Sequence, residues 1–285
     1  MRYNNKNVIL PNVFVQPDEI WYTSSDGNIV TPYRINSLPT IVSNTYIDGK
    51  GIFKFERDAT IIGQKAFESC NTLTSMMIPN SVTSIGYTAF GYCTNLRTIN
   101  LPNNIIDIGP GAFDNCSSLI SVLIPNKVTS IGAYAFNGCS SLTTITIPNS
   151  VTSIGGSAFS YCRSLTSLYV EEGNTVYDSR NNCNAIIHTE SNKLIKGCQN
   201  TTIPDSVTSI ETYAFAGCTG SFPINIPNSV TSIGENAFFE CTGLRSVGIP
   251  SSVTTIRPYT FYSCTGLTYI QIKNGLTSIE ERAFQ

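Results

Sequence analysis

A phenylalanine recurs every 23 residues along most of this chain, and no other feature of the sequence constrains the fold as strongly. It stands in an Ala-Phe or Thr-Phe pair at Phe67, Phe90, Phe113, Phe136 and Phe159, and then at Phe215, Phe238, Phe261 and Phe284. The two runs are 56 residues apart, which is one period plus an insertion of 33. A fixed period of this length indicates a solenoid, in which each repeat packs mainly against its neighbours. The sequence therefore predicts one elongated stack of coils.

Each repeat contains two short extended segments. The most regular copy is residues 142–162, LTTITIPNSVTSIGGSAFSYC, in which Leu-x-x-Ile-x-Ile ends in the alternation of a strand. Pro148 ends this strand, because proline has no N–H to donate to a ladder. Val-Thr-Ser-Ile is a second extended segment. Residues 156–162 are too few for a regular helix, so we expect one helical or 3-10 turn there.

The ten cysteines fall into two groups. Because adjacent coils are ~4.8 Å apart, stacked Cβ atoms lie slightly beyond the ~3.5–4.5 Å that a disulfide requires. We therefore expect a ladder of free, buried thiols, with a disulfide or metal ladder as the less favoured alternative. Cys183 and Cys198 lie outside the repeat, and their spacing allows either a disulfide or two free thiols. The ladder cysteines, each three residues after a repeat phenylalanine, are Cys70, Cys93, Cys116, Cys139, Cys162, Cys218, Cys241 and Cys264.

Residues 1–57 lack the repeat and are expected to form an N-terminal β-hairpin cap. Asp26-Gly27 and the segment 48–51 each lie between runs of aromatic and β-branched residues, which predicts two hairpins. A cap would cover the apolar interior of the first coil; the alternative is a separate aromatic binding module. The N-terminus lacks an apolar segment of signal-peptide length, and no apolar run reaches the ~18 residues of a membrane span.

The repeat LxxIxIPxxVTxIGxxAFxxCxxL, from about residue 58 to the end, resembles the BspA-like leucine-rich-repeat family, which includes treponemal leucine-rich-repeat proteins. The N-terminal stretches EIWYTSSDGNIVTPY and IVSNTYIDGKG are similar to the start of gut Bacteroidales members. The resemblance implies a curved right-handed leucine-rich-repeat solenoid over residues 58–285, with the LxxIxIP strands in a parallel sheet on the concave side. It also implies a bacterial cell-surface or secreted protein that adheres to host matrix proteins or to other cells.

Two places depart from the repeat. Residues 168–200 contain an insertion, in which residues 185–189 and 193–196 flank Glu190-Ser191-Asn192 and predict a hairpin that projects from the convex face or an edge. The chain also stops at Gln285, one residue after Phe284, with the last coil incomplete. We expect the array to continue in a longer protein, or this end to be covered by another chain in an end-to-end contact.

The residues for catalysis are scarce. His188 is the sole histidine, no GxSxG or phosphate-binding glycine motif occurs, and the cysteines have no metal-ligand spacing. The sequence therefore predicts no enzyme, no metal and no cofactor. Charged residues make up 13% of the chain and the net charge is -2, which argues against a nucleic-acid partner.

The outward side of the LxxIxIP strands is the predicted binding surface. The residue between the two isoleucine-type positions of each strand varies freely between repeats, while the inward positions hardly change. This pattern is expected either for drift on a solvated face or for a binding row. We expect a protein-binding, adhesin-type function; the alternatives are an intracellular scaffold or structural component, which the missing signal and the thiols favour, and a carbohydrate-binding module. The predicted binding residues are Met77, Asn100, Leu123, Thr146, Tyr169, Thr202, Asn225, Gly248 and Gln271, with Tyr269 beside them; Tyr169 and Tyr269 are the expected anchors.

Overall fold

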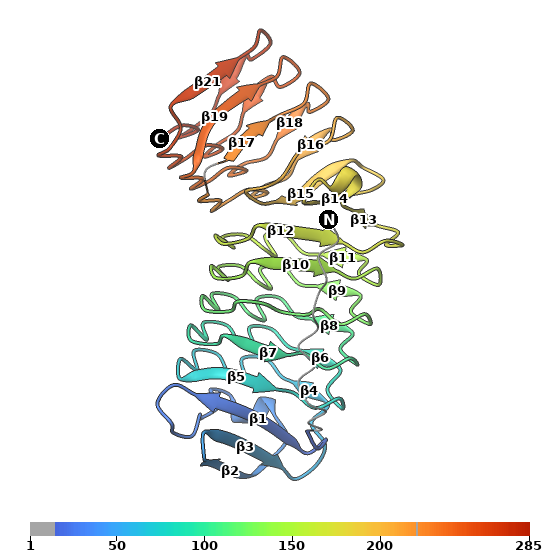
Figure 1. Cartoon of the computed structure of the whole chain (residues 1–285), viewed down its shortest axis with the longest axis vertical. Helices are drawn as coiled ribbons and strands as arrows, with labels where there is room; N and C mark the ends of the chain where they lie inside the picture. The colour runs from blue at the N-terminus through green and yellow to red at the C-terminus, as the bar shows by residue number, and fades with distance from the viewer. Residues whose placement is uncertain (1–14, 221) are drawn as a thin grey trace, which may run out of the picture.

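The computed structural model describes residues 15–220 and 222–285, so the first 14 residues of the predicted N-terminal module lie outside the described residues. The protein is an elongated β-solenoid whose coils stack along the long axis of the molecule (Figure 1). This is the predicted leucine-rich-repeat solenoid. Most coils contribute two short strands, and within each sheet a strand pairs with its counterpart in the neighbouring coil.

The first strand of each coil comes from the LxxIxIP segment. Parallel pairing joins β5 to β7 and β10 to β12. It also joins β17 to β19, and β19 to β21. The third coil forms a single bridge, between Thr98 and Ser121, in place of a strand. The first strands are β5 Leu73–Met77, β7 Thr98–Asn100, β10 Thr144–Ile147, β12 Ser167–Val170, β17 Phe222–Asn225, β19 Leu244–Ile249 and β21 Tyr269–Ile272.

The second strand of each coil is a pair of residues that ends in isoleucine, and in six of the nine coils it is followed directly by glycine. The glycine is required by close packing: a Cβ on Gly155 would lie 2.2 Å from the nitrogen of Ala133 in the preceding coil. The second strands are β4 Ile61–Ile62, β6 Ser84–Ile85, β8 Asp107–Ile108, β9 Ser130–Ile131, β11 Ser153–Ile154, β16 Ser209–Ile210, β18 Ser232–Ile233, β20 Thr255–Ile256 and β22 Ser278–Ile279.

The segment around each repeat phenylalanine, here called the Phe turn, is a pair of tight turns, and the expected helical or 3-10 turn was wrong. Backbone bonds such as Ala89 N to Gly86 O and Cys93 N to Phe90 O close two successive turns. The residues two before and two after each phenylalanine have positive φ, as at Lys65 (59°), and this interrupts any helix. In the described chain the 3-10 segments are η1 Ile35–Ser37 and η2 Arg180–Asn182, both outside the repeat.

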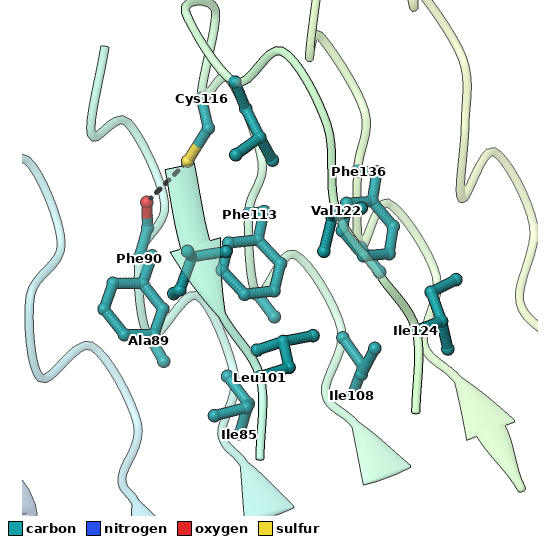
Figure 2. Close-up of a cluster of buried hydrophobic side chains, with 14 of the residues drawn as sticks. Ile85, Ala89, Phe90, Leu101, Ile108, Phe113, Cys116, Val122, Ile124 and Phe136 are labelled. Atoms are coloured by element: carbon teal, nitrogen blue, oxygen red, sulfur yellow. Dashed lines mark hydrogen bonds between the residues drawn. The ribbon is translucent and has the colours of Figure 1, made fainter. Parts of the chain in front are cut away.

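The core is a column of phenylalanine rings enclosed by the branched side chains of the strands (Figure 2). Phe90 and Phe113 stack with their ring centroids 5.3 Å apart and their planes 2° apart, and both are fully buried. Ladder cysteines lie beside this column: the Cys116 thiol donates to the carbonyl oxygen of Phe90 over 3.1 Å. Every ladder cysteine is free, as predicted.

The N-terminal segment covers the first coil with β1 Glu19–Ser24, β2 Ile41–Ile47 and β3 Lys50–Phe55. The hairpin predicted at Asp48–Gly51 joins β2 to β3. The hairpin predicted at Asp26-Gly27 does not form. Both edges of β1 are already occupied, one by β3 and the other by β5, so no edge remains for the residues that follow the turn.

The insertion forms β13 Tyr177–Asp178, β14 Ala185–His188 and β15 Lys193–Gly197. β14 and β15 make the predicted hairpin, but it is stacked inside the solenoid and does not project. β15 pairs in parallel with β16, which continues the column of second strands, and the hairpin side chains Ile186, Ile187 and Leu194 are fully buried. Burial of these apolar side chains is the reason that the hairpin lies within the stack.

The insertion divides the solenoid into two stacks that meet at an angle (Figure 1). At the Phe turns the stacks are in direct contact, because Tyr161 N donates to Ala216 O over 3.2 Å. At the second strands they are separated: β11 ends its sheet, and the phenol oxygen of Tyr177 accepts the Ile154 N–H over 3.0 Å. The insertion thus acts as a wedge on one side of the molecule.

Candidate binding surfaces

The outward positions of the first strands form a row along one face, here called the strand row. Alternation sets it: in β10, Ile145 and Ile147 are buried while Thr144 and Thr146 are exposed. Parallel pairing then places equivalent residues side by side, as with Thr146 and Tyr169.

The structure places the predicted residues on this face, with large differences in exposure. Leu123 is 78% exposed, Tyr269 60% and Tyr169 44%. Met77 and Gly248 are partly buried, and Thr202 lies outside any strand, at the insertion. Asn100, Thr146, Asn225 and Gln271 are exposed and polar. The row therefore has three large apolar or aromatic side chains and no charged residue.

Trp21 extends the strand row at its N-terminal end, and sequence analysis did not identify it. It is the antiparallel partner of Met77, so both side chains lie on the same side of the sheet. The Lys50 ammonium lies 3.0 Å from the centroid of the indole ring. The alternation of Ile20, Trp21 and Tyr22 signals the outward direction of Trp21, but the pairing of β1 with β5 does not follow from sequence.

A second group of aromatic side chains lies on the Phe turns at the junction of the two stacks; we call it the turn cluster. Tyr161 contacts Tyr213 and Phe239 with centroid distances of 6.4 and 6.3 Å, and Phe239 stacks on Tyr262 at 5.1 Å. These residues come from both stacks. Sequence analysis missed the cluster, although aromatic residues recur within two positions of the repeat phenylalanine.

An ion pair fixes the turn cluster across the junction. Arg163 lies over the Tyr161 ring at 5.6 Å and pairs with Glu240 over 2.6 Å, joining residues 77 apart in sequence. Burial and the neighbouring Glu240 carboxylate raise the pKa of Tyr161 to about 12. The phenol therefore stays neutral at physiological pH.

Burial makes most of the thiols unreactive, although a hydrogen bond with Cys241 lowers the pKa values of Cys218 and Cys264. Burial raises the pKa of Cys70 to about 11 and that of Cys162 to about 12, so the reactive thiolate is scarce near pH 7. Cys183 and Cys198 are free, and the disulfide that their spacing allowed does not form. Each thiol is directed at a backbone carbonyl instead, Cys183 at Ala185 over 3.8 Å and Cys198 at Asn184 over 3.5 Å.

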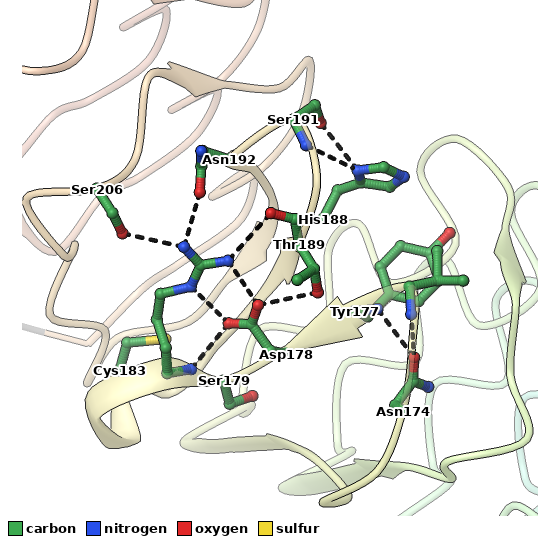
Figure 3. Close-up of polar contacts among 12 residues, drawn as sticks. Asn174, Tyr177, Asp178, Ser179, Cys183, His188, Thr189, Ser191, Asn192 and Ser206 are labelled. Atoms are coloured by element: carbon green, nitrogen blue, oxygen red, sulfur yellow. Dashed lines mark hydrogen bonds and ion pairs between the residues drawn. The ribbon is translucent and has the colours of Figure 1, made fainter.

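His188 belongs to a polar network that holds the insertion together (Figure 3). Its Nδ1 atom accepts the backbone N–H of Ser191 over 3.3 Å and lies 2.9 Å from the Ser191 hydroxyl, which makes it a turn cap. Nearby, the Arg180 guanidinium binds both carboxylate oxygens of Asp178, over 2.8 and 2.6 Å, and also Asn192 over 2.7 Å. These contacts orient the hairpin, and each has a local structural role.

Within residues 15–220 and 222–285, no group of three or more His, Cys, Asp or Glu side chains is placed to hold a metal ion. No helix within these residues has the length and hydropathy of a membrane span.

The sequence matches a known family, and the fold is similar to those of several solved bacterial proteins. The family model for the BspA type leucine rich repeat region matches residues 60–188 and 186–285 in six copies. A leucine rich cell surface protein from Faecalibacterium prausnitzii A2-165 has 23% identity and a TM-score of 0.53, and the match covers 93% of this chain and 95% of that one. A leucine-rich repeat protein from Bacteroides ovatus ATCC 8483 has 25% identity and a TM-score of 0.50, with 95% and 79% covered. One from Eubacterium ventriosum ATCC 27560 has 23% identity and a TM-score of 0.51, with 79% and 80% covered. A search of curated proteins found no match.

Proposed function

Because the chain belongs to the BspA-type leucine-rich-repeat family, we propose that it is a non-enzymatic, adhesin-type protein that binds partner proteins through the strand row. The observation that carries the proposal is the exposure of Leu123, Tyr169 and Tyr269 in a row whose predicted positions have no charged side chain. Large apolar and tyrosine side chains supply contact area at a low cost in entropy.

The dimensions of the row suit a protein partner. The five coils from Met77 to Tyr169 span about 20 Å at strand spacing, and the C-terminal stack adds Asn225, Gly248 and Gln271 beyond the junction. Flanking outward residues such as Thr144 and Ser167 widen the face. A patch of this kind can provide the ~800 Å² per partner of a standard interface. Since the row lacks charge, its binding should depend weakly on salt.

The similar Faecalibacterium protein is a cell surface protein, which supports a location at the cell surface or outside the cell. An intracellular scaffold is the alternative, favoured by ten free cysteines, which suit a reducing compartment. The carbohydrate-binding alternative has fewer N-terminal aromatic residues available, because Tyr22, Phe53 and Phe55 are each at most 2% exposed; Tyr33 is 62% exposed and Trp21 is partly exposed.

The test is a binding screen by surface plasmon resonance against purified extracellular-matrix proteins and bacterial surface proteins, with a substituted strand row. The double variant Leu123→Asp/Tyr169→Asp should weaken the binding of any partner at least tenfold, which corresponds to about 1.4 kcal/mol. Ile106→Asp/Tyr92→Asp is the matched control, because it adds the same charge at side chains that are 51% and 46% exposed away from the row.

Two outcomes would argue against the proposal. One is a folded protein that binds no candidate at micromolar affinity. The other is equal loss of binding in the two double variants, because added charge anywhere on the surface would then explain the effect.

A further inference from the structure

A cavity of about 360 Å³ lies at the junction of the two stacks. One wall comes from the N-terminal stack, with Tyr134 and residues 154–160, and the other from the C-terminal stack, with Ile195, Lys196 and residues 211–213. The cavity exists because β11 has no strand partner on this side, since Tyr177 covers its free edge at Ile154. Its volume is in the range of small-molecule sites in proteins.

Lys196 is the unusual residue in this cavity. It is only 5% exposed and lines the cavity. Its ammonium has no hydrogen bond or ion pair with any described residue, and the adjacent Glu211 pairs instead with Lys193 over 3.3 Å. The Lys196 ammonium is not among the buried polar atoms that lack a hydrogen bond, so it is accessible from the cavity, where no described residue acts as its partner.

The surroundings of Lys196 do not supply that partner. Burial raises the pKa values of Cys162 and Cys198 despite the nearby positive charge of Lys196, and a hydrogen bond with Cys241 is the main cause of the lowered pKa of Cys218. Burial outweighs this charge at Cys162, where it raises the pKa to about 12, so that thiol stays neutral. Lys193 and Glu211 neutralise one another in their ion pair, so Lys196 leaves one net positive charge at the cavity.

Gly156 leaves room in the wall of the cavity. At the equivalent position, three residues before the repeat phenylalanine, the other coils have Gln64, Tyr87, Pro110, Ala133, Thr212, Glu235, Pro258 and Glu281. Backbone geometry does not require glycine here: its φ is not positive, and an added Cβ would meet nothing within 4 Å. The missing side chain therefore opens space in the one N-terminal coil that faces the junction.

We propose that this cavity binds a small carboxylate with an aromatic or apolar body. Lys196 would receive the carboxylate in a charge-assisted hydrogen bond, and Tyr134 and Tyr213 would contact the body from the two stacks. One unpaired positive charge matches one carboxylate. The site is separate from the strand row, so this inference does not depend on the proposed protein binding.

Isothermal titration of the full chain with phenylacetate tests the inference, and phenylacetamide is the neutral control of the same shape. Phenylacetate should bind saturably, and phenylacetamide at least tenfold more weakly. Lys196→Met should weaken phenylacetate binding at least tenfold, whereas the unfolding temperature of the free protein should change little, because the ammonium is accessible and has no protein partner to lose. A lysine with a purely structural role would instead lower that temperature when replaced.

Gly156→Gln gives a second test that leaves Lys196 in place. It should keep the wild-type unfolding temperature, because the added Cβ has no close neighbour, and should abolish binding by filling the cavity. Lys127→Met, an exposed change far along the chain, should leave phenylacetate binding unchanged. The inference is wrong if the wild type shows no saturation up to about 10 mM phenylacetate, if phenylacetamide binds equally well, or if Lys196→Met binds like the wild type.

Discussion

Phe136 lies in a column of rings, with Phe113 on one side at 5.2 Å and Phe159 on the other at 5.5 Å. Its side chain is fully buried. Stacked aromatic contacts add to the free energy of apolar burial, and each ring also fills the space between two strands. The phenylalanine recurs every 23 residues because each coil needs one ring to fill this space.

Replacing Phe136 with Ala should lower the free energy of unfolding by about 3–5 kcal/mol, measured by urea denaturation, because it leaves a cavity in a closed column. Phe284→Ala is the matched control. Phe284 is 40% exposed and stacks on one side only, against Phe261, so its loss should be less than half as large. Equal losses at the two positions would show that the column does not determine stability.

The buried thiols give the protein a defined response to alkaline pH. Folding raises the pKa of Cys70 and Cys183 from 9.0 to about 11. Above pH 9 the unfolded chain loses these protons while the native protein keeps them. The unfolded chain therefore binds fewer protons than the native protein, and the free energy of unfolding falls as the pH rises. The unfolding temperature should therefore be insensitive to these groups below pH 9 and should decrease between pH 9 and 11.

Cys70→Ala/Cys183→Ala should reduce the steepness of that alkaline decrease, as measured by differential scanning calorimetry at pH 8, 9, 10 and 11. A double variant with the wild-type slope would exclude the thiols as the cause. As an independent check, the unfolded, unreduced wild type should titrate ten free thiols.

At the scale of elements, the Phe turn contains the largest local strain of each coil. Ser69 has a φ of 58°, and two other coils have glycine at the same position, two residues after the phenylalanine, namely Gly138 and Gly217. A non-glycine residue in this conformation costs roughly 1–2 kcal/mol, partly offset by the greater entropy of glycine in the unfolded chain.

Ser69→Gly should therefore raise the free energy of unfolding by about 0.5–1 kcal/mol. Ser167→Gly, in the extended strand β12, is the control and should lower it by a similar amount. Chemical denaturation of both variants measures the difference. A destabilising Ser69→Gly would mean that the strain at this position is relieved by contacts of the serine side chain.

The strands were predictable from sequence because their cause is local. Alternation in residues 142–147 and the break at Pro148 determine β10 and its end. The Phe turn was not predictable from sequence, because its positive φ values follow from closing the coil on its neighbours. Residues as different as Tyr134 and Ser157 adopt these values. For the same reason the hairpin predicted at Asp26-Gly27 was wrong, because the partners of β1 are β3 and β5 and do not follow from the local sequence.

At the scale of the whole molecule, the insertion separates two hydrophobic cores. One extends from Ile20 to Cys198 and the other from Cys183 to Ala283. In a solenoid, stability is the sum of the coils and of the interfaces between neighbours. Since the junction has a cavity on one side and the Tyr161–Ala216 backbone bond on the other, we expect it to be the weakest interface.

Phe238→Ala should therefore destabilise mainly the C-terminal stack. By hydrogen exchange with mass spectrometry, amides of residues 203–285 should exchange at least tenfold faster, while those of residues 59–170 should keep their wild-type rates. Phe113→Ala is the reciprocal variant and should accelerate the N-terminal stack. Equal acceleration in both stacks would show that the solenoid unfolds as one unit across the insertion.

The candidate surfaces differ in how far they follow from sequence. The strand row required only the direction of alternating side chains, so its residues could be named in advance. The turn cluster and the Lys196 cavity depend on which coils meet at the junction, and contacts such as Arg163 with Glu240 join residues 77 apart. Sequence located the insertion but not the angle or the contacts that it creates.

Site-specific photo-crosslinking tests the central claim, that partners bind the strand row, most directly. A benzophenone amino acid replaces Tyr169 in one variant and Tyr92, which is 46% exposed on a Phe turn, in the other. We predict that a purified matrix or surface protein that binds the wild type is crosslinked from position 169 and not from position 92. Crosslinking from position 92 alone would place the partner on the Phe turns and contradict the account.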